Sequence, residues 1–160
     1  MKHLVYIIIA VIGLASCSHG KVVVTEANLP EDIFYLDDEI KPYTGKAFIY
    51  YVGTDIIKEE LTYREGILNG DIISYYKSGE IKRKGEYYMG LLTGKWECWY
   101  ENGKKHYEVE YSNDTLCGAY ISWYATGVIE KKGSFIRNNR SGSWVEYDEA
   151  GMIIKKQDYN

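Results

Sequence analysis

The chain has 160 residues, a length that usually corresponds to one domain. It contains 17 tyrosines and only two prolines, a composition that favours strands. The formal net charge of −4 argues against a nucleic-acid-binding protein, because such proteins need a basic face.

Residues 1–16 have the pattern of an export signal. A short basic start at Lys2 precedes an apolar run from Leu4 to Ala15, which is shorter than the ~20 residues that span a membrane. The run ends in Leu14-Ala15-Ser16-Cys17, which resembles the cleavage box of bacterial lipoproteins. This resemblance implies cleavage before Cys17 and lipidation of its thiol and amine, since two or more acyl chains anchor a protein stably. The alternative is an ordinary signal peptide, or a short core segment with a chance cysteine.

Residues 17–44 lie outside any repeat. Ser18 rather than Asp follows Cys17, which favours the outer over the inner membrane of a bacterial envelope. Val22-Val23-Val24 is strand-like, and Pro30 indicates a turn. We expect this stretch to serve as a tether and as an N-terminal cap, because the end units of repeat proteins are capped.

Residues 45–160 are organised by two series of glycines with a period of 24 residues. A fixed period of this length indicates a repeat protein. Strand-like runs flank the second series, so each unit is predicted to be a strand, a tight turn, a strand and a loop. The predicted fold is all-β: an elongated, twisted antiparallel sheet of five tandem hairpins, the last of them truncated. The first series is Gly70, Gly94, Gly118 and Gly142, and the second is Gly79, Gly103, Gly127 and Gly151.

The turn at Asn102-Gly103 can form in two ways. Both residues tolerate positive φ, as a two-residue hairpin turn requires, and a three-residue turn with a glycine bulge fits equally well. A turn centred here sets Trp96 opposite Val109, Cys98 opposite Tyr107 and Tyr100 opposite Lys105. The same register sets Ile72 opposite Gly85 and Tyr120 opposite Gly133, so that a large side chain covers bare backbone.

The loops between units carry residues that tolerate the left-handed conformation. These are Gly66, Gly90, Asp114 and Asn138.

Two columns of large residues follow the period on opposite faces of the predicted sheet. Ile72, Trp96, Tyr120 and Trp144 form the column on the packed face. Tyr75, Trp99, Trp123 and Tyr147 form the other. The second column either covers the backbone and shields neighbouring strands, or forms an exposed aromatic groove for a peptide, a glycan or a partner protein.

The units resemble MORN repeats, in the variant found in tandem in many bacterial proteins. The resemblance rests on a W-x-x-W-Y-x-x-G core from Trp96 to Gly103, its echo from Tyr120 to Gly127, and the L-x-G ends at Leu92 and Leu116. It implies a twisted sheet of successive hairpins that serves as a protein-binding or membrane-proximal scaffold. Some relatives of this kind are antitoxins of the YwqK type.

The sequence shows no catalytic, metal-binding or cofactor-binding pattern. The three histidines lack metal-ligand spacing, and His106 is predicted on an exposed face. No serine elbow, phosphate loop or Cys–His pair is present. Cys98 and Cys117 could form a disulfide in an exported protein, or could remain as partly buried thiols.

We therefore expect a non-enzymatic, lipid-anchored envelope protein that acts as a binding scaffold. Its partners would be a membrane, through Cys17, and a protein whose identity the sequence does not reveal. The alternative is an immunity or antitoxin protein that neutralises one toxin. A catalytic role is disfavoured.

Overall fold

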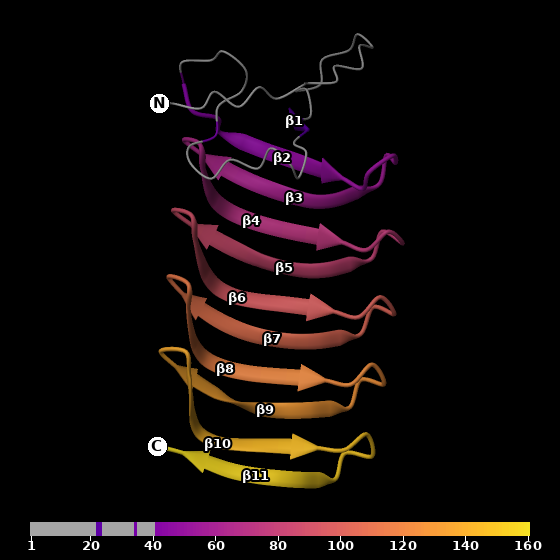
Figure 1. Cartoon of the computed structure of the whole chain (residues 1–160), viewed down its shortest axis with the longest axis vertical. Coiled ribbons are helices and arrows are strands. Elements are labelled where there is room, and N and C mark those ends of the chain that lie inside the picture. The colour runs from indigo at the N-terminus through magenta and orange to yellow at the C-terminus, as the bar shows by residue number, and fades with distance from the viewer. Residues whose placement is uncertain (1–21, 24–33, 35–40) are drawn as a thin grey trace.

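The computed structural model describes residues 22–23, 34 and 41–160, which form a single sheet of eleven strands (Figure 1). The strands lie in chain order. β1 pairs with β2 in parallel, and every later pair is antiparallel. The predicted all-β sheet of tandem hairpins is therefore confirmed. In the described part of the chain, no helix is long and apolar enough to cross a membrane.

The strands are β1 (Val22–Val23), β2 (Gly45–Tyr50), β3 (Ile57–Arg64), β4 (Ile67–Tyr75), β5 (Ile81–Tyr88), β6 (Leu91–Trp99), β7 (Lys105–Ser112), β8 (Thr115–Trp123), β9 (Ile129–Ile136), β10 (Asn139–Tyr147) and β11 (Ile153–Tyr159). We call the row of hairpins along the sheet the stack.

The turn is the three-residue form in the second to fifth hairpins. In the first hairpin it is one residue longer, since the amide of Tyr51 donates to the carbonyl of Ile56. In the third hairpin the amide of Gly103 donates to the carbonyl of Tyr100 at 2.9 Å, and the amide of Tyr100 donates to the carbonyl of Lys104 at 2.8 Å. Gly103 has a φ of 78°, whereas Asn102 is not among the residues with positive φ. Gly103 forms a bulge in this turn, and the bulge shifts the pairing of the two strands next to the turn by one residue. Lys105 therefore pairs with Trp99, and the predicted pairing of Lys105 with Tyr100 is wrong.

The other predicted pairs, which lie further from the bulge, are confirmed. They are Trp96 with Val109, Cys98 with Tyr107, Ile72 with Gly85, and Tyr120 with Gly133.

The connections between hairpins are two-residue turns rather than loops. Asn113 and Asp114 have φ values of 48° and 60°, and both residues of each equivalent turn are left-handed, which is the geometry of a type I′ turn. The side chain of Asp114 also accepts a hydrogen bond from the amide of Leu92 at 2.7 Å. The turn residue thus joins one hairpin to the next as well as reversing the chain.

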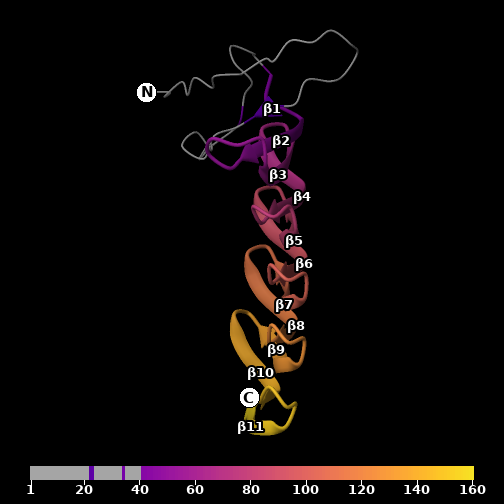
Figure 2. The ribbon, with the colours of Figure 1, turned by 90° about the vertical axis from the view of Figure 1, so that its right-hand side faces the viewer.

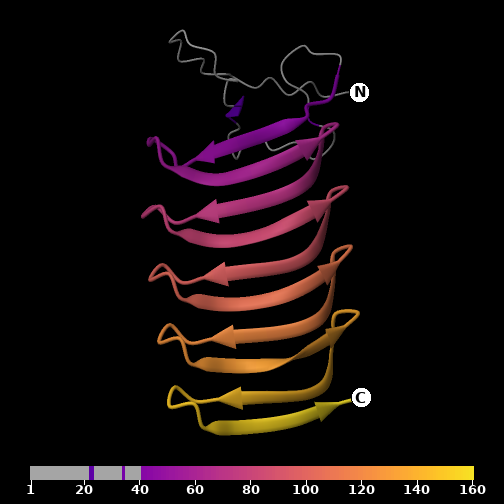
Figure 3. The same ribbon diagram turned by 180° about the vertical axis from the view of Figure 1, so that it is seen from behind.

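The first glycine series lies inside strands, not at their boundaries. Gly94 has a φ of 64°, and the register between β5 and β6 shifts beside it, so that Gly94–Trp96 lie opposite the single residue Gly85. The strand bends at this bulge. Figure 3 shows the result: β4, β6, β8 and β10 each start along the stack and then turn to run across it.

The described strands form one layer, as the edge-on view in Figure 2 shows, and their core lies on one face. We call this the core face and the opposite one the outer face. Ile72, Trp96 and Trp144 are buried on the core face, and Tyr120 is half-buried. A Cβ on Gly85 would overlap the indole of Trp96. The residue that covers Gly85 therefore comes from the following strand and not, as predicted, from its opposite partner Ile72.

The N-terminal end of the stack is closed by residues that precede β2. β1 pairs with β2, and Phe34 is fully buried against the rings of Tyr43 and Tyr63. The amide of Phe34 donates to the carbonyl of Gly66 at 2.8 Å. These contacts cover part of an edge that would otherwise be open to other strands.

Candidate functional site

The aromatic column Tyr75, Trp99, Trp123 and Tyr147 lies on the outer face. Its members are the last residues of β4, β6, β8 and β10, and all four are half-buried. Successive members are two strands apart, which corresponds to about 9.5 Å. Their paired neighbours Ile81, Lys105, Ile129 and Ile153 lie on the same face, so the column forms a continuous stripe along the stack.

The backbone of the column is held by a ladder of tyrosine hydroxyls that the sequence analysis missed. The hydroxyl of Tyr76 donates to the carbonyl of Trp99 at 2.7 Å, and that of Tyr100 donates to the carbonyl of Trp123 at 2.8 Å. Tyr51 and Tyr124 make the same bond to Tyr75 and Tyr147. The signal was a second aromatic residue directly after three of the four column positions, as in Trp99-Tyr100.

Charged groups lie against three of the four rings. The hydroxyl of Tyr75 donates to Glu60 at 2.8 Å, and burial together with this bond raises the pKa of Tyr75 to about 12. The ammonium of Lys105 is 5.7 Å from the ring centre of Trp123, and that of Lys132 is 5.5 Å from Tyr147. Both distances fit cation–π contacts. The column is therefore amphipathic rather than purely apolar.

An ion network beside the column links β6 to β7. Lys105 contacts Glu97 and Glu108 at 2.7 Å each, and Lys95 contacts Glu108 at 2.8 Å. The hydrogen bond from Lys105 lowers the pKa of Glu97, and the two carboxylates raise the pKa of Lys105. The charges at the middle of the outer face are thus already matched within the protein.

Charge on the outer face changes along the stack. One row of paired residues crosses the outer face beside the column. β3–β7 contribute mostly ionisable residues to this row. In β8–β11, apolar residues alternate with lysines. The row reads Glu60, Ile73, Lys84, Glu97, Glu108, Ile121, Lys132, Val145 and Lys156. Asp158 is the one acidic strand residue on the outer face of β8–β11, and it lies further along β11, away from the column.

The core face carries a hollow of about 230 Å³ between the two tryptophans. On either side of it a tryptophan covers a glycine of the preceding strand, whereas here Tyr120 lies opposite Val109. The ring of Tyr120 stacks instead on Trp144, with ring centres 5.5 Å apart. Its walls are apolar and aromatic, without a charged group. The lining residues are Tyr107, Val109, Tyr111, Leu116, Tyr120 and Phe135.

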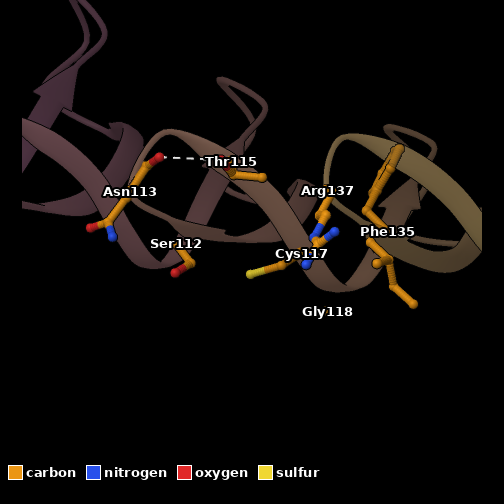
Figure 4. Close-up of a pocket in the computed structure, with 8 residues that line it drawn as sticks. Ser112, Asn113, Thr115, Cys117, Gly118, Phe135 and Arg137 are labelled. Carbon is orange, nitrogen blue, oxygen red and sulfur yellow. Dashed lines mark hydrogen bonds between the residues drawn. The ribbon is translucent and has the colours of Figure 1, made fainter.

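A wider hollow of about 450 Å³ lies near the turn between β7 and β8 (Figure 4). Cys117 and Arg137 are among its lining residues, and the hydroxyl of Thr115 donates to the carbonyl of Asn113 at 3.2 Å. Its lining residues include no carboxylate and no imidazole, although Glu110 pairs with Cys117 on the neighbouring strand.

Both cysteines in the described part of the chain are free thiols, which decides between the two alternatives that the sequence left open. Cys98 is buried on the core face and hydrogen-bonded with Tyr107, and burial raises the pKa of its thiol. His106 is half-buried and stacks on Tyr100 at 4.2 Å, so the predicted exposure is wrong. Cys17 and the leader lie outside the described residues.

The described residues contain no cluster of histidine, cysteine and carboxylate side chains that could hold a metal ion. The ordered features of the molecule are a single sheet of tandem hairpins, a buried core on one face and an amphipathic aromatic stripe on the other. These define a β-hairpin repeat protein with an extended surface.

Three of the hairpins match the family model described as MORN repeat variant, over residues 68–87, 92–113 and 116–137. The resemblance noted from the sequence is confirmed for these repeats. No curated protein matches the chain.

Proposed function

We propose that this protein is a non-enzymatic scaffold, held on the bacterial cell envelope by lipid on Cys17, that binds a protein partner through the aromatic column. The observation that carries the proposal is the column itself, a half-exposed aromatic stripe along a face that none of the described elements covers. Contiguous apolar stripes on soluble domains commonly mark interaction sites, and aromatic residues dominate the energy of such contacts.

The shape of the molecule supports binding over catalysis. A stack of hairpins offers a long surface with repeated chemistry, which suits recognition of an extended partner. The match to the MORN repeat variant supports the same conclusion, because these repeats often bind proteins or membranes. The tyrosine ladder keeps the backbone beneath the column in place, so the surface is preformed.

The binding test is a crosslinking pull-down from envelope extract with the double variant Trp99→Ala, Trp123→Ala. We expect loss of capture while the circular dichroism spectrum stays as in the wild type. Tyr88→Ala is the matched control, because Tyr88 is 57% exposed and lies outside the column. Undiminished capture by the double variant would contradict the proposal. Loss of the fold would show that the column is needed for folding rather than for binding.

The anchoring test is Cys17→Ala, which should move the protein from the membrane fraction to the soluble fraction. Cys117→Ala serves as a control, since it removes a thiol that lies in the repeats and should leave fractionation unchanged. Retention of the Cys17 variant on the membrane would rule out lipid anchoring. Ser18 after the anchor supports the outer membrane as the site of retention.

An immunity or antitoxin role is the second candidate, supported by the resemblance of the repeats to antitoxins of the YwqK type. A toxin gene beside the gene for this protein would favour it, whereas an envelope-assembly or polysaccharide operon would favour the scaffold. In either case the column would be the contact surface.

A further inference from the structure

We propose that the outer face of β8–β11 binds an extended acidic segment of the partner, which runs along the stack and presents a carboxylate at about every third residue. This inference rests on the proposed function, because it assigns the chemistry of the partner that the aromatic column contacts.

The charge of this surface selects an anionic ligand. Lys132 and Lys156 are exposed, and neither forms an ion pair in the described part of the chain. Lys105, in contrast, is already matched by Glu97 and Glu108. A carboxylate would therefore gain most at Lys132, because β8, β9 and β10 carry no outer-face carboxylate. Lys156 offers a second unpaired ammonium, and Asp158 lies two residues further along β11 on the same face.

The order of side chains on the surface sets the pattern of the ligand. Ile121, Lys132, Val145 and Lys156 pair in register, so apolar and cationic residues alternate along the stack. Val145 is half-buried and lies between the two lysines. A complementary ligand presents an apolar group between two anionic groups.

The spacing of the lysines sets the length of the ligand repeat. Lys132 on β9 and Lys156 on β11 are two strands apart, or about 9.5 Å between their backbones. A polyproline II helix advances about 3.1 Å per residue and has three residues per turn, so every third side chain recurs on one side after about 9.3 Å. Peptides in this conformation commonly dock on aromatic grooves, and Trp123 and Tyr147 supply two rings at the same spacing.

The surface around the lysines leaves room for a peptide backbone. Ala119, Ser134 and Ser143 occupy the neighbouring outer-face positions on β8, β9 and β10, and Asp158 occupies the position on β11 that pairs with Ser143. These side chains are short, so no long side chain rises from those positions against the ligand. The N-terminal half is more acidic in this row, since on β4–β7 Asp71, Glu86 and Glu110 lie at comparable positions beside the single lysine Lys95 and would repel a carboxylate.

The test is fluorescence anisotropy with the full-length chain and a labelled peptide of five Glu-Pro-Pro units. We expect binding that weakens as salt is raised. Each of Lys132→Gln and Lys156→Gln should reduce affinity about two- to fivefold, the range of an exposed ion pair. Lys131→Gln is the matched control, because Lys131 is the sequence neighbour of Lys132 but pairs with Glu146 on the core face.

Four outcomes would overturn the inference. The first is equal binding of a Gln-Pro-Pro peptide, which would remove the carboxylates from recognition. The second is an equal effect of Lys131→Gln and Lys132→Gln. The third is concentration-dependent dimerisation that buries this surface, which would make a second copy its occupant. If no peptide binds but Trp99→Ala, Trp123→Ala still abolishes partner capture, this inference fails and the proposed function stands.

Discussion

The indole ring of Trp96 lies against the backbone of Gly85, in the place where any larger residue would carry its side chain. Trp144 repeats this relationship with Gly133. The glycine and the tryptophan belong to adjacent strands, and the bulge at Gly94 lets the tryptophan fold over its neighbour. Packing on the core face thus depends on pairs of residues, one small and one large, rather than on a uniform apolar row.

We predict that Gly85→Ala destabilises the protein by about 1–3 kcal/mol, because the added methyl group overlaps the indole of Trp96. Urea unfolding monitored by tryptophan fluorescence would measure this. Gly85→Ala combined with Trp96→Leu should cost less than the sum of the two single changes, since the smaller side chain makes room. Strict additivity would show that the two residues do not share one packing site.

Removal of one hydroxyl from the tyrosine ladder should weaken the contact between hairpins. Tyr100→Phe leaves the carbonyl of Trp123 without its donor, and we expect a loss of about 1 kcal/mol in the free energy of unfolding. Tyr88→Phe is the control and should stay within about 0.5 kcal/mol of the wild type, because Tyr88 is largely exposed. Equal effects of the two changes would argue against the ladder.

The buried tyrosines predict a loss of stability at high pH. Burial raises the pKa of Tyr63 from its ordinary value of 10 to about 12, so the folded state resists ionisation that the unfolded state allows. The contribution is fully present below pH 10 and is lost as the pH rises through 12. Tyr63→Phe should therefore show a smaller fall in unfolding free energy between pH 10 and 12 than the wild type. An identical fall in both proteins would exclude Tyr63 as a source.

Phe34→Ala should open the N-terminal end of the stack. The ring is fully buried between Tyr43 and Tyr63, and its removal should cost about 3–5 kcal/mol. Hydrogen exchange should rise first at β2 and β3 and stay unchanged at β10 and β11, because each hairpin contacts only its neighbours. Ile136→Ala, at a residue 61% exposed, should produce neither effect. A uniform rise along the whole stack would contradict a local cap.

The places where prediction from sequence failed share one cause. The register near Lys105 was wrong because a bulge adds a residue without a distinct sequence signature. The cover of Gly85 was assigned to Ile72 because pairing was considered only within one hairpin, whereas Trp96 comes from the next one. His106 was predicted to be exposed, yet it stacks on Tyr100 across the same bulged turn. Each error concerns a contact that forms only when strands bend.

The 24-residue period by itself determined the repeat architecture, the number of hairpins and the existence of two columns on opposite faces. Glycine spacing and alternation are local properties, and they persist in any arrangement of the strands. The tertiary structure alone decided how strongly each column is buried, which hydroxyl meets which carbonyl, and where lysines stand without a matching carboxylate. These depend on distances between successive hairpins, because a side chain is buried or paired only by neighbours that the sheet brings to it.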